Sequence, residues 1–78
     1  MYFFDIDEFL FLLTIMFKVL LKAIENEDYV IIKGFTGIDP SLEASIICIG
    51  VEAMNRTTIY RQQDAHSCTW RLKRGTKV

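Results

Sequence analysis

The stretch Phe9–Ile24 reads FLFLLTIMFKVLLKAI, and its only polar side chains are Thr14, Lys18 and Lys22. These three residues recur every four positions, which is the spacing of one face of an α-helix. The same line continues to Asp7 before the stretch and to Glu25 after it. We therefore expect one long helix with a narrow polar stripe. Its apolar remainder needs cover from its own domain and from a partner.

The composition supports this need for a partner. The chain has 78 residues, the size of one domain, and 51% of them are hydrophobic. A chain this short buries only about 60% of its unfolded surface, so some of this apolar area stays exposed or is covered by another chain. We expect a homo- or hetero-oligomer whose interface contains Phe9, Leu13, Phe17, Ile46 and Ile49.

The chain divides into segments of clear type, and we expect them to form a single domain, 1–78. Residues 1–28 hold the apolar helix, and residues 1–6 form either a short first strand or the lead-in to that helix. The other segments are a strand at 29–34, a helix at 39–56, a hairpin at 57–74 and a tail at 75–78. The order (β)αβαββ predicts a two-layer α/β (α+β) domain, with two helices on a mixed sheet and a C-terminal hairpin.

Local patterns refine these segments. Asp39-Pro40 is a typical helix start, and Gly50 inside that helix indicates a close contact. The strand 29–34 is apolar on both faces, which is typical of a central strand covered by helices. The crossover 39–56 predicts that the strands on either side of it run parallel. In the last strand Cys68, Trp70 and Leu72 alternate with polar residues, which predicts one buried face.

The charge is divided unevenly along the chain. Residues 1–56 carry nine acids against four bases, whereas residues 57–78 carry five bases against one acid. Basic and amide side chains on a protruding hairpin are suited to contacts with a phosphate backbone, and Tyr60 and Trp70 are interleaved with them. A solvated hairpin is the alternative. We expect RNA or DNA, if bound, to meet Lys33, Arg61, Gln62, Arg71, Lys73 and Arg74.

Catalysis is not indicated. The single histidine, His66, falls at the predicted hairpin tip, and Gly34 and Gly37 match no phosphate-loop spacing. We expect no enzyme activity, cofactor, metal or small-molecule substrate. Cys48 and Cys68 fit no metal-ligand pattern, so we expect buried free thiols and an intracellular location, in cytoplasm or nucleus. A membrane span is disfavoured because Lys18 and Lys22 interrupt the apolar run.

Three stretches resemble the Alba family of small chromatin and RNA-binding proteins. They are Tyr29–Gly34, like that family's second strand and glycine loop; Ile38–Arg56, like its second helix; and Thr57–Gln62 with Cys68–Arg74, like its closing hairpin. The resemblance implies a dimerising domain that contacts nucleic acid. The family's lysines at the junction of first strand and first helix are replaced here by Asp5-Ile6-Asp7-Glu8. The implied phosphate-binding role therefore extends only to Lys33, Arg61 and Arg71.

Three hypotheses follow for the function. The first is a non-catalytic association subunit, part of a dimer or ribonucleoprotein, with nucleic acid on the basic hairpin. The second is a pure protein-binding module, such as a small inhibitor or adaptor, which a short apolar-rich chain suits equally well. The third is a membrane-associated small protein.

Overall fold

Seven elements make up the part of the chain that the computed structural model describes, residues 1–55 and 57–75. In order they are β1 (Tyr2–Asp5), α1 (Ile6–Ile15), α2 (Phe17–Glu25), β2 (Tyr29–Phe35), α3 (Pro40–Ala53), β3 (Thr58–Gln63) and β4 (Ser67–Lys73). The small α+β domain with a mixed sheet and C-terminal hairpin is confirmed, and residues 2–5 do form a first strand. The predicted helix end at Arg56 and the tail residues 76–78 lie outside the described residues.

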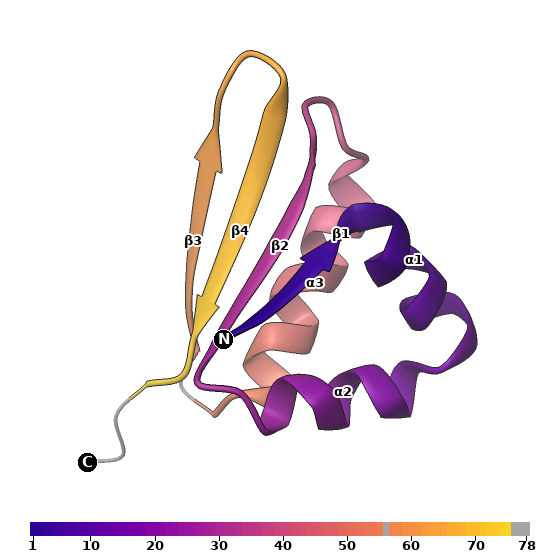
Figure 1. Cartoon of the computed structure of the whole chain (residues 1–78), viewed down its shortest axis with the longest axis vertical. Coiled ribbons are helices and arrows are strands. Elements are labelled where there is room, and N and C mark those ends of the chain that lie inside the picture. Colours follow the sequence, from indigo (N-terminus) through magenta and orange to yellow (C-terminus); the bar gives the residue numbers. More distant parts are fainter. Residues whose placement is uncertain (56, 76–78) are drawn as a thin grey trace.

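The four strands form one sheet in the order β1-β2-β4-β3 (Figure 1). β1 runs parallel to β2, while β4 pairs antiparallel with both β2 and β3. β2 and β3 therefore point the same way, as the α3 crossover predicts, but β4 lies between them. The last strand is thus central in the sheet, and β3 forms the edge.

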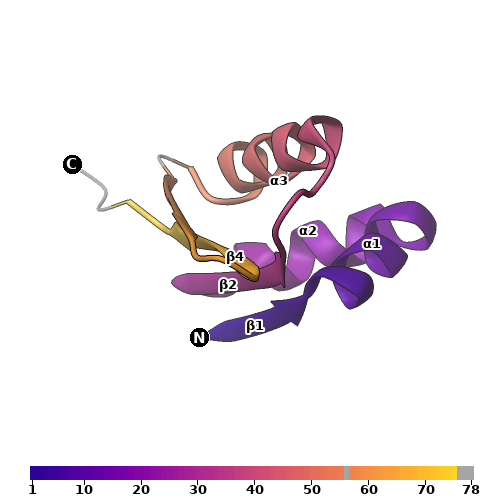
Figure 2. The same cartoon turned by 90° about the horizontal axis from the view of Figure 1, so that it is seen from above.

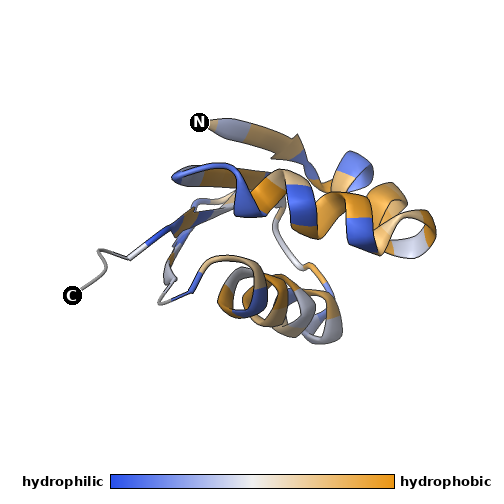
Figure 3. Cartoon of the chain, turned by 90° about the horizontal axis from the view of Figure 1, so that it is seen from below, coloured by the Kyte–Doolittle hydropathy of each residue, from blue (hydrophilic) through white to orange (hydrophobic). Residues whose placement is uncertain are grey.

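The helices lie on one side of this sheet, as Figures 2 and 3 show from above and below. Val30 and Ile32 of β2 and Trp70 and Leu72 of β4 point toward the helices and are at most 1% exposed. The rest of the buried core comprises Phe4, Ile6, Phe9, Leu20, Ile24, Ile46, Ile49, Met54 and Cys68. Strand 29–34 is central in the sheet as expected, but its alternate residues are half-buried or exposed, so the helices cover only one of its two faces.

The predicted long helix is broken at Met16, which has φ −136° and ψ 54°. Its N–H still bonds the Leu12 carbonyl at 2.8 Å, and its own carbonyl accepts the Leu20 N–H at 3.1 Å. A continuous helix of about 20 residues would be about 30 Å long. The β1–β2 pair spans only four residues, so the chain must turn back to reach the start of β2 (Figure 1). The polar stripe Thr14, Lys18 and Lys22 is exposed on both halves, as predicted.

Gly50 brings α3 close to the sheet, as its position in the sequence indicated. A Cβ built on Gly50 would lie 2.6 Å from Leu72 Cδ2 and 3.3 Å from Ile59 Cδ1. Leu72 is fully buried, so its side chain has little room to move away. The missing side chain therefore sets the depth at which α3 packs on β3 and β4.

We predict that Gly50→Ala destabilises the domain although alanine favours helix by about 1 kcal/mol. The clash with Leu72 costs about 1–3 kcal/mol as overpacking and outweighs the gain. Leu72→Val removes the clashing δ-methyl, so Gly50→Ala in that background should be neutral or stabilising. Urea denaturation of the four chains measures the cycle, and an additive result would contradict the close packing assigned to Gly50.

Candidate nucleic-acid interface

The sheet face turned away from the helices carries the candidate site, and strand register defines which side chains share it. Residues paired across strands point to the same side. One row runs Phe3, Ile31, Arg71, Tyr60; the next runs Asp5, Lys33, Thr69, Gln62; the third runs Tyr29, Lys73, Thr58. With Phe35 and Ser67 beyond the second row, these residues form what we call the open face.

Three aromatic rings on the open face are more than half exposed to solvent. Phe3, Phe35 and Tyr60 are 54%, 61% and 59% exposed, whereas Trp70 on the opposite side is 1% exposed. Tyr29 is half-buried. Unpaired bases stack on accessible rings of this kind regardless of sequence, because every base has a π-face.

Positive charge gathers on the same face. Lys33, Arg71 and Lys73 are exposed there, and Arg71 lies directly opposite Tyr60 in the β3–β4 register. Of the ten acids in the chain, only Asp5 lies on the open face by register. The others lie on helices, loops and the hairpin tip, so a chain with formal charge −1 presents a basic sheet face.

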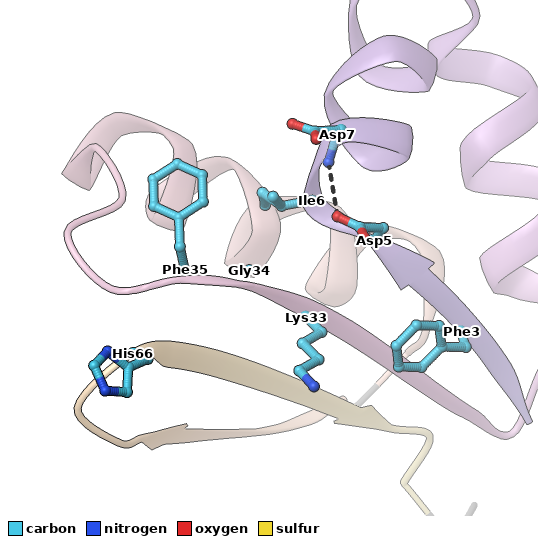
Figure 4. A pocket seen from close by; sticks show the side chains of 8 residues that line it. All are labelled: Phe3, Asp5, Ile6, Asp7, Lys33, Gly34, Phe35 and His66. Atoms are coloured by element: carbon cyan, nitrogen blue, oxygen red, sulfur yellow. Dashed lines mark hydrogen bonds between the residues drawn. The ribbon is translucent and has the colours of Figure 1, made fainter.

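A shallow pocket of about 400 Å³ lies at one end of the open face, beside the start of α1 (Figure 4). Phe3, Phe35, Lys33 and His66 line it together with Asp5, Ile6, Asp7 and Gly34. Asp5 caps α1 by accepting the Asp7 N–H at 3.3 Å. Its volume lies within the range of small-ligand pockets, and Phe3 and Phe35 supply aromatic surface to its lining.

Gly34 allows this end of the sheet to close tightly behind the pocket. A Cβ at Gly34 would meet Ile38 Cδ1 at 2.7 Å and Ile6 Cβ at 3.1 Å. The absent side chain lets the first turn of α1 approach β2, so Asp5 and Asp7 line the same pocket as Lys33 (Figure 4).

Asp64 orders the tip of the β3–β4 hairpin next to the pocket. Its Oδ1 accepts the backbone N–H groups of His66 at 2.8 Å and Ser67 at 2.6 Å, and its Oδ2 accepts the Ser67 hydroxyl at 2.8 Å. The His66 carbonyl in turn accepts the Thr36 N–H at 3.3 Å, which ties the tip to the end of β2. These bonds, the one from the His66 backbone first, hold the pKa of Asp64 below its ordinary value of 3.8.

We predict that the hairpin tip loosens in acid. Because the folded pKa of Asp64 is depressed, its stabilisation is complete above pH 3.8 and is lost as pH falls through the lower folded value. NMR titration of the carboxyl carbon should give a midpoint below 3.8, and the His66 and Ser67 amides should exchange faster below it. Asp64→Ala should exchange these amides rapidly at neutral pH as well. A midpoint at or above 3.8 would contradict the assignment.

The structure brings four of the six predicted nucleic-acid residues together. Lys33, Gln62, Arg71 and Lys73 lie on the open face and are exposed. Arg61 instead pairs in register with buried Trp70 and points to the helix side. Its Nε lies 2.6 Å from Glu43 Oε1 on α3, the same oxygen that accepts the Trp70 indole N–H at 3.4 Å.

Arg74, the other predicted contact, does not lie on the open face either. Lys73 is the last residue of β4 and faces the open side, whereas Arg74 is half-buried. Its Nε and Nη2 atoms are buried and lack a hydrogen-bond partner among the described residues. A guanidinium in this position is not presented to a phosphate.

We predict that Arg61→Ala lowers the free energy of unfolding of the domain. The ion pair to Glu43 is partly solvent-exposed, so its loss should cost about 0.5–1 kcal/mol. Lys73→Ala, an exposed change in the same hairpin, should leave the urea midpoint unchanged. If the two variants lose stability equally, Arg61 does not have the structural role assigned to it.

The predicted partner interface requires correction. Phe9, Ile46 and Ile49 are at most 2% exposed because they fill the domain's own core, so they are not available to a second chain. Leu13 is half-buried, and Phe17 is 39% exposed. Cys68 is buried as expected, but Cys48 lies exposed on α3, and both are free thiols.

Sequence reasoning missed the aromatic residues of the open face other than Tyr60. Tyr29, Ile31, Lys33 and Phe35 alternate with the buried Val30 and Ile32, and this period of two was the available signal. Phe3 lay in a segment whose strand character was left open, so its partner Ile31 was not identified.

Among residues 1–55 and 57–75, no three His, Cys, Asp or Glu side chains lie close enough to hold a metal ion. None of the helices in that same part of the chain has the length and hydropathy to cross a lipid bilayer.

Comparison with known proteins adds no identification. Neither the models of known families nor the curated proteins nor the solved structures contain a match to this chain.

Proposed function

We propose that this chain is a small non-catalytic binding domain whose open face holds single-stranded nucleic acid, with RNA as the first candidate. The observation that carries the proposal is the coincidence of three rings more than half exposed with three basic side chains on one sheet face. The rest of the chain is acidic, so this concentration is not a consequence of composition.

Each group on the face has a defined role in this proposal. Phe3, Phe35 and Tyr60 stack on unpaired bases, while Lys33, Arg71 and Lys73 neutralise phosphates. Gln62 and Thr69, in the same row as Lys33, supply hydrogen bonds to base edges. A duplex hides its base faces inside the stack, so single strands are favoured over duplexes.

This proposal agrees with the nucleic-acid contact that the resemblance to the Alba family implies, but it moves the contact from the hairpin arm to the whole sheet face. An intracellular location, supported by two free thiols, would bring the domain together with RNA. The alternative of a protein-binding module is favoured by a different surface, the exposed apolar residues of α1 and α2.

We predict that the intact chain binds a labelled single strand of about 12 nucleotides, a length within the site sizes of such folds, in a fluorescence anisotropy titration. Lys33→Ala, Arg71→Ala and Lys73→Ala should each weaken binding and lower the slope of log affinity against log salt by about 0.7. Phe35→Ala and Tyr60→Ala should each reduce the binding free energy by about 1–3 kcal/mol without changing that slope.

Arg61→Ala is the matched control, because this arginine lies on the same hairpin but on the helix side. Its affinity should equal that of the unchanged chain. The proposal fails if the intact chain retains no oligonucleotide at low salt. It fails equally if aromatic variants bind as tightly as the unchanged chain.

A further inference from the structure

The turn between α1 and α2 exposes a second surface, unrelated to the open face. Six large apolar side chains within ten residues are between 38% and 64% exposed there. We call this set the corner patch, and it comprises Leu10, Phe11, Ile15, Met16, Phe17 and Val19. These six side chains surround one turn of the chain, and monomeric proteins rarely expose this much apolar surface in one region, so the turn is a candidate interaction site.

Charges of opposite sign lie on the two helices that form the corner patch. Asp7 and Glu8 are exposed in the first turn of α1. Asp7, Phe11 and Ile15 are four residues apart, so they lie along one stripe of that helix. On α2, Lys18 and Lys22 are exposed at the same spacing.

We propose that the corner patch pairs with the corner patch of a second copy of this chain about a two-fold axis. In such an isologous contact the same surface meets itself. In an antiparallel pair, Asp7 and Glu8 of one copy lie against Lys18 and Lys22 of the other, and the two-fold axis repeats this contact. The apolar side chains of the two corner patches then pack against each other.

The charges around the corner patch favour a second copy of this chain over a lipid surface or a different protein. An anionic lipid surface would attract Lys18 and Lys22 but repel Asp7 and Glu8, which flank the same apolar residues. A different protein would need bases opposite Asp7 and Glu8 and acids opposite Lys18 and Lys22. A second copy of this chain carries both groups already. The corner patch also lies at the far side of the fold from β3 (Figure 1), so pairing leaves the β3–β4 part of the open face accessible, while Asp7 at the edge of the interface also lines the pocket beside β1.

Sedimentation velocity of the full chain at rising concentration tests the proposal, and charge-swapped chains test its geometry. One chain carries Asp7→Lys and Glu8→Lys, and the other carries Lys18→Glu and Lys22→Glu. Each alone places like charges across the interface and should self-associate roughly tenfold or more weakly. An equimolar mixture places opposite charges across it and should restore a dimer, now a heterodimer, with affinity near that of the unchanged chain.

Ile15→Ser provides an independent variant without a charge change, and circular dichroism verifies that every chain is folded. It should weaken the dimer roughly tenfold or more, in line with the truncation of a well-buried interface residue. Val51→Ser is the matched control, because Val51 is 59% exposed on α3, away from the corner patch. It should leave the dimer unchanged.

Three results would overturn the proposal. The unchanged chain could remain monomeric at every concentration, or its dimer could survive Ile15→Ser and the charge swaps. The third is a chain that is monomeric in solution and binds vesicles of anionic lipid through the corner patch, which would identify a membrane surface as the occupant.

Discussion

One layer of helices has to cover the apolar side of a four-stranded sheet, and the rest of the structure depends on that packing. Val30 and Ile32 of β2 and Trp70 and Leu72 of β4 form the floor of the core. α3 can pack closely on these residues because Gly50 has no side chain to clash with Leu72. Glu43 on the same helix holds both the Trp70 indole and the Arg61 side chain, which anchors the edge strand to α3. The helices within residues 1–55 and 57–75 all serve this face, so the other side of the sheet stays open.

The same division separates the charges. Helix starts favour acids, and Asp39, Asp5 and the exposed Glu8 lie at or near such starts. The outward positions of β2 and β4 carry lysine and arginine instead. The segregation of charge is therefore built into which element covers which face, and it makes one side of an acidic chain basic.

Local periodicity was enough to predict much of the fold. The alternation at Cys68, Trp70 and Leu72 gave the buried face of β4 correctly, because a strand period of two needs no tertiary information. The same pattern in Tyr29–Phe35 was misinterpreted, since apolar residues on both sides do not tell how many helices are available to cover them. Arg61 was expected among the nucleic-acid contacts, but its direction depends on its register with Trp70, and a sequence without a known turn does not fix that register.

The break at Met16 lay beyond such reasoning for a different cause. The sequence there has neither glycine nor proline, and the uninterrupted apolar run predicts one helix. The break follows from chain connectivity, since a short parallel β1–β2 pair requires the chain to return within a few turns. The predicted partner residues were affected in the same way. Folding the helix back on itself buried Phe9 and turned Phe11, Ile15 and Val19 outward.

The turn at Met16 thus links the two proposed surfaces. By bending back, α1 and α2 stay beside the helix-covered face of the sheet and expose their apolar excess at the corner opposite β3 (Figure 1). A dimer formed through that corner carries two open faces held at a fixed separation. A single strand long enough to reach both would bind the second face as an intramolecular event, and avidity would raise affinity without a new contact. Variants of the corner patch and of the open face should then be coupled for long strands and independent for short ones.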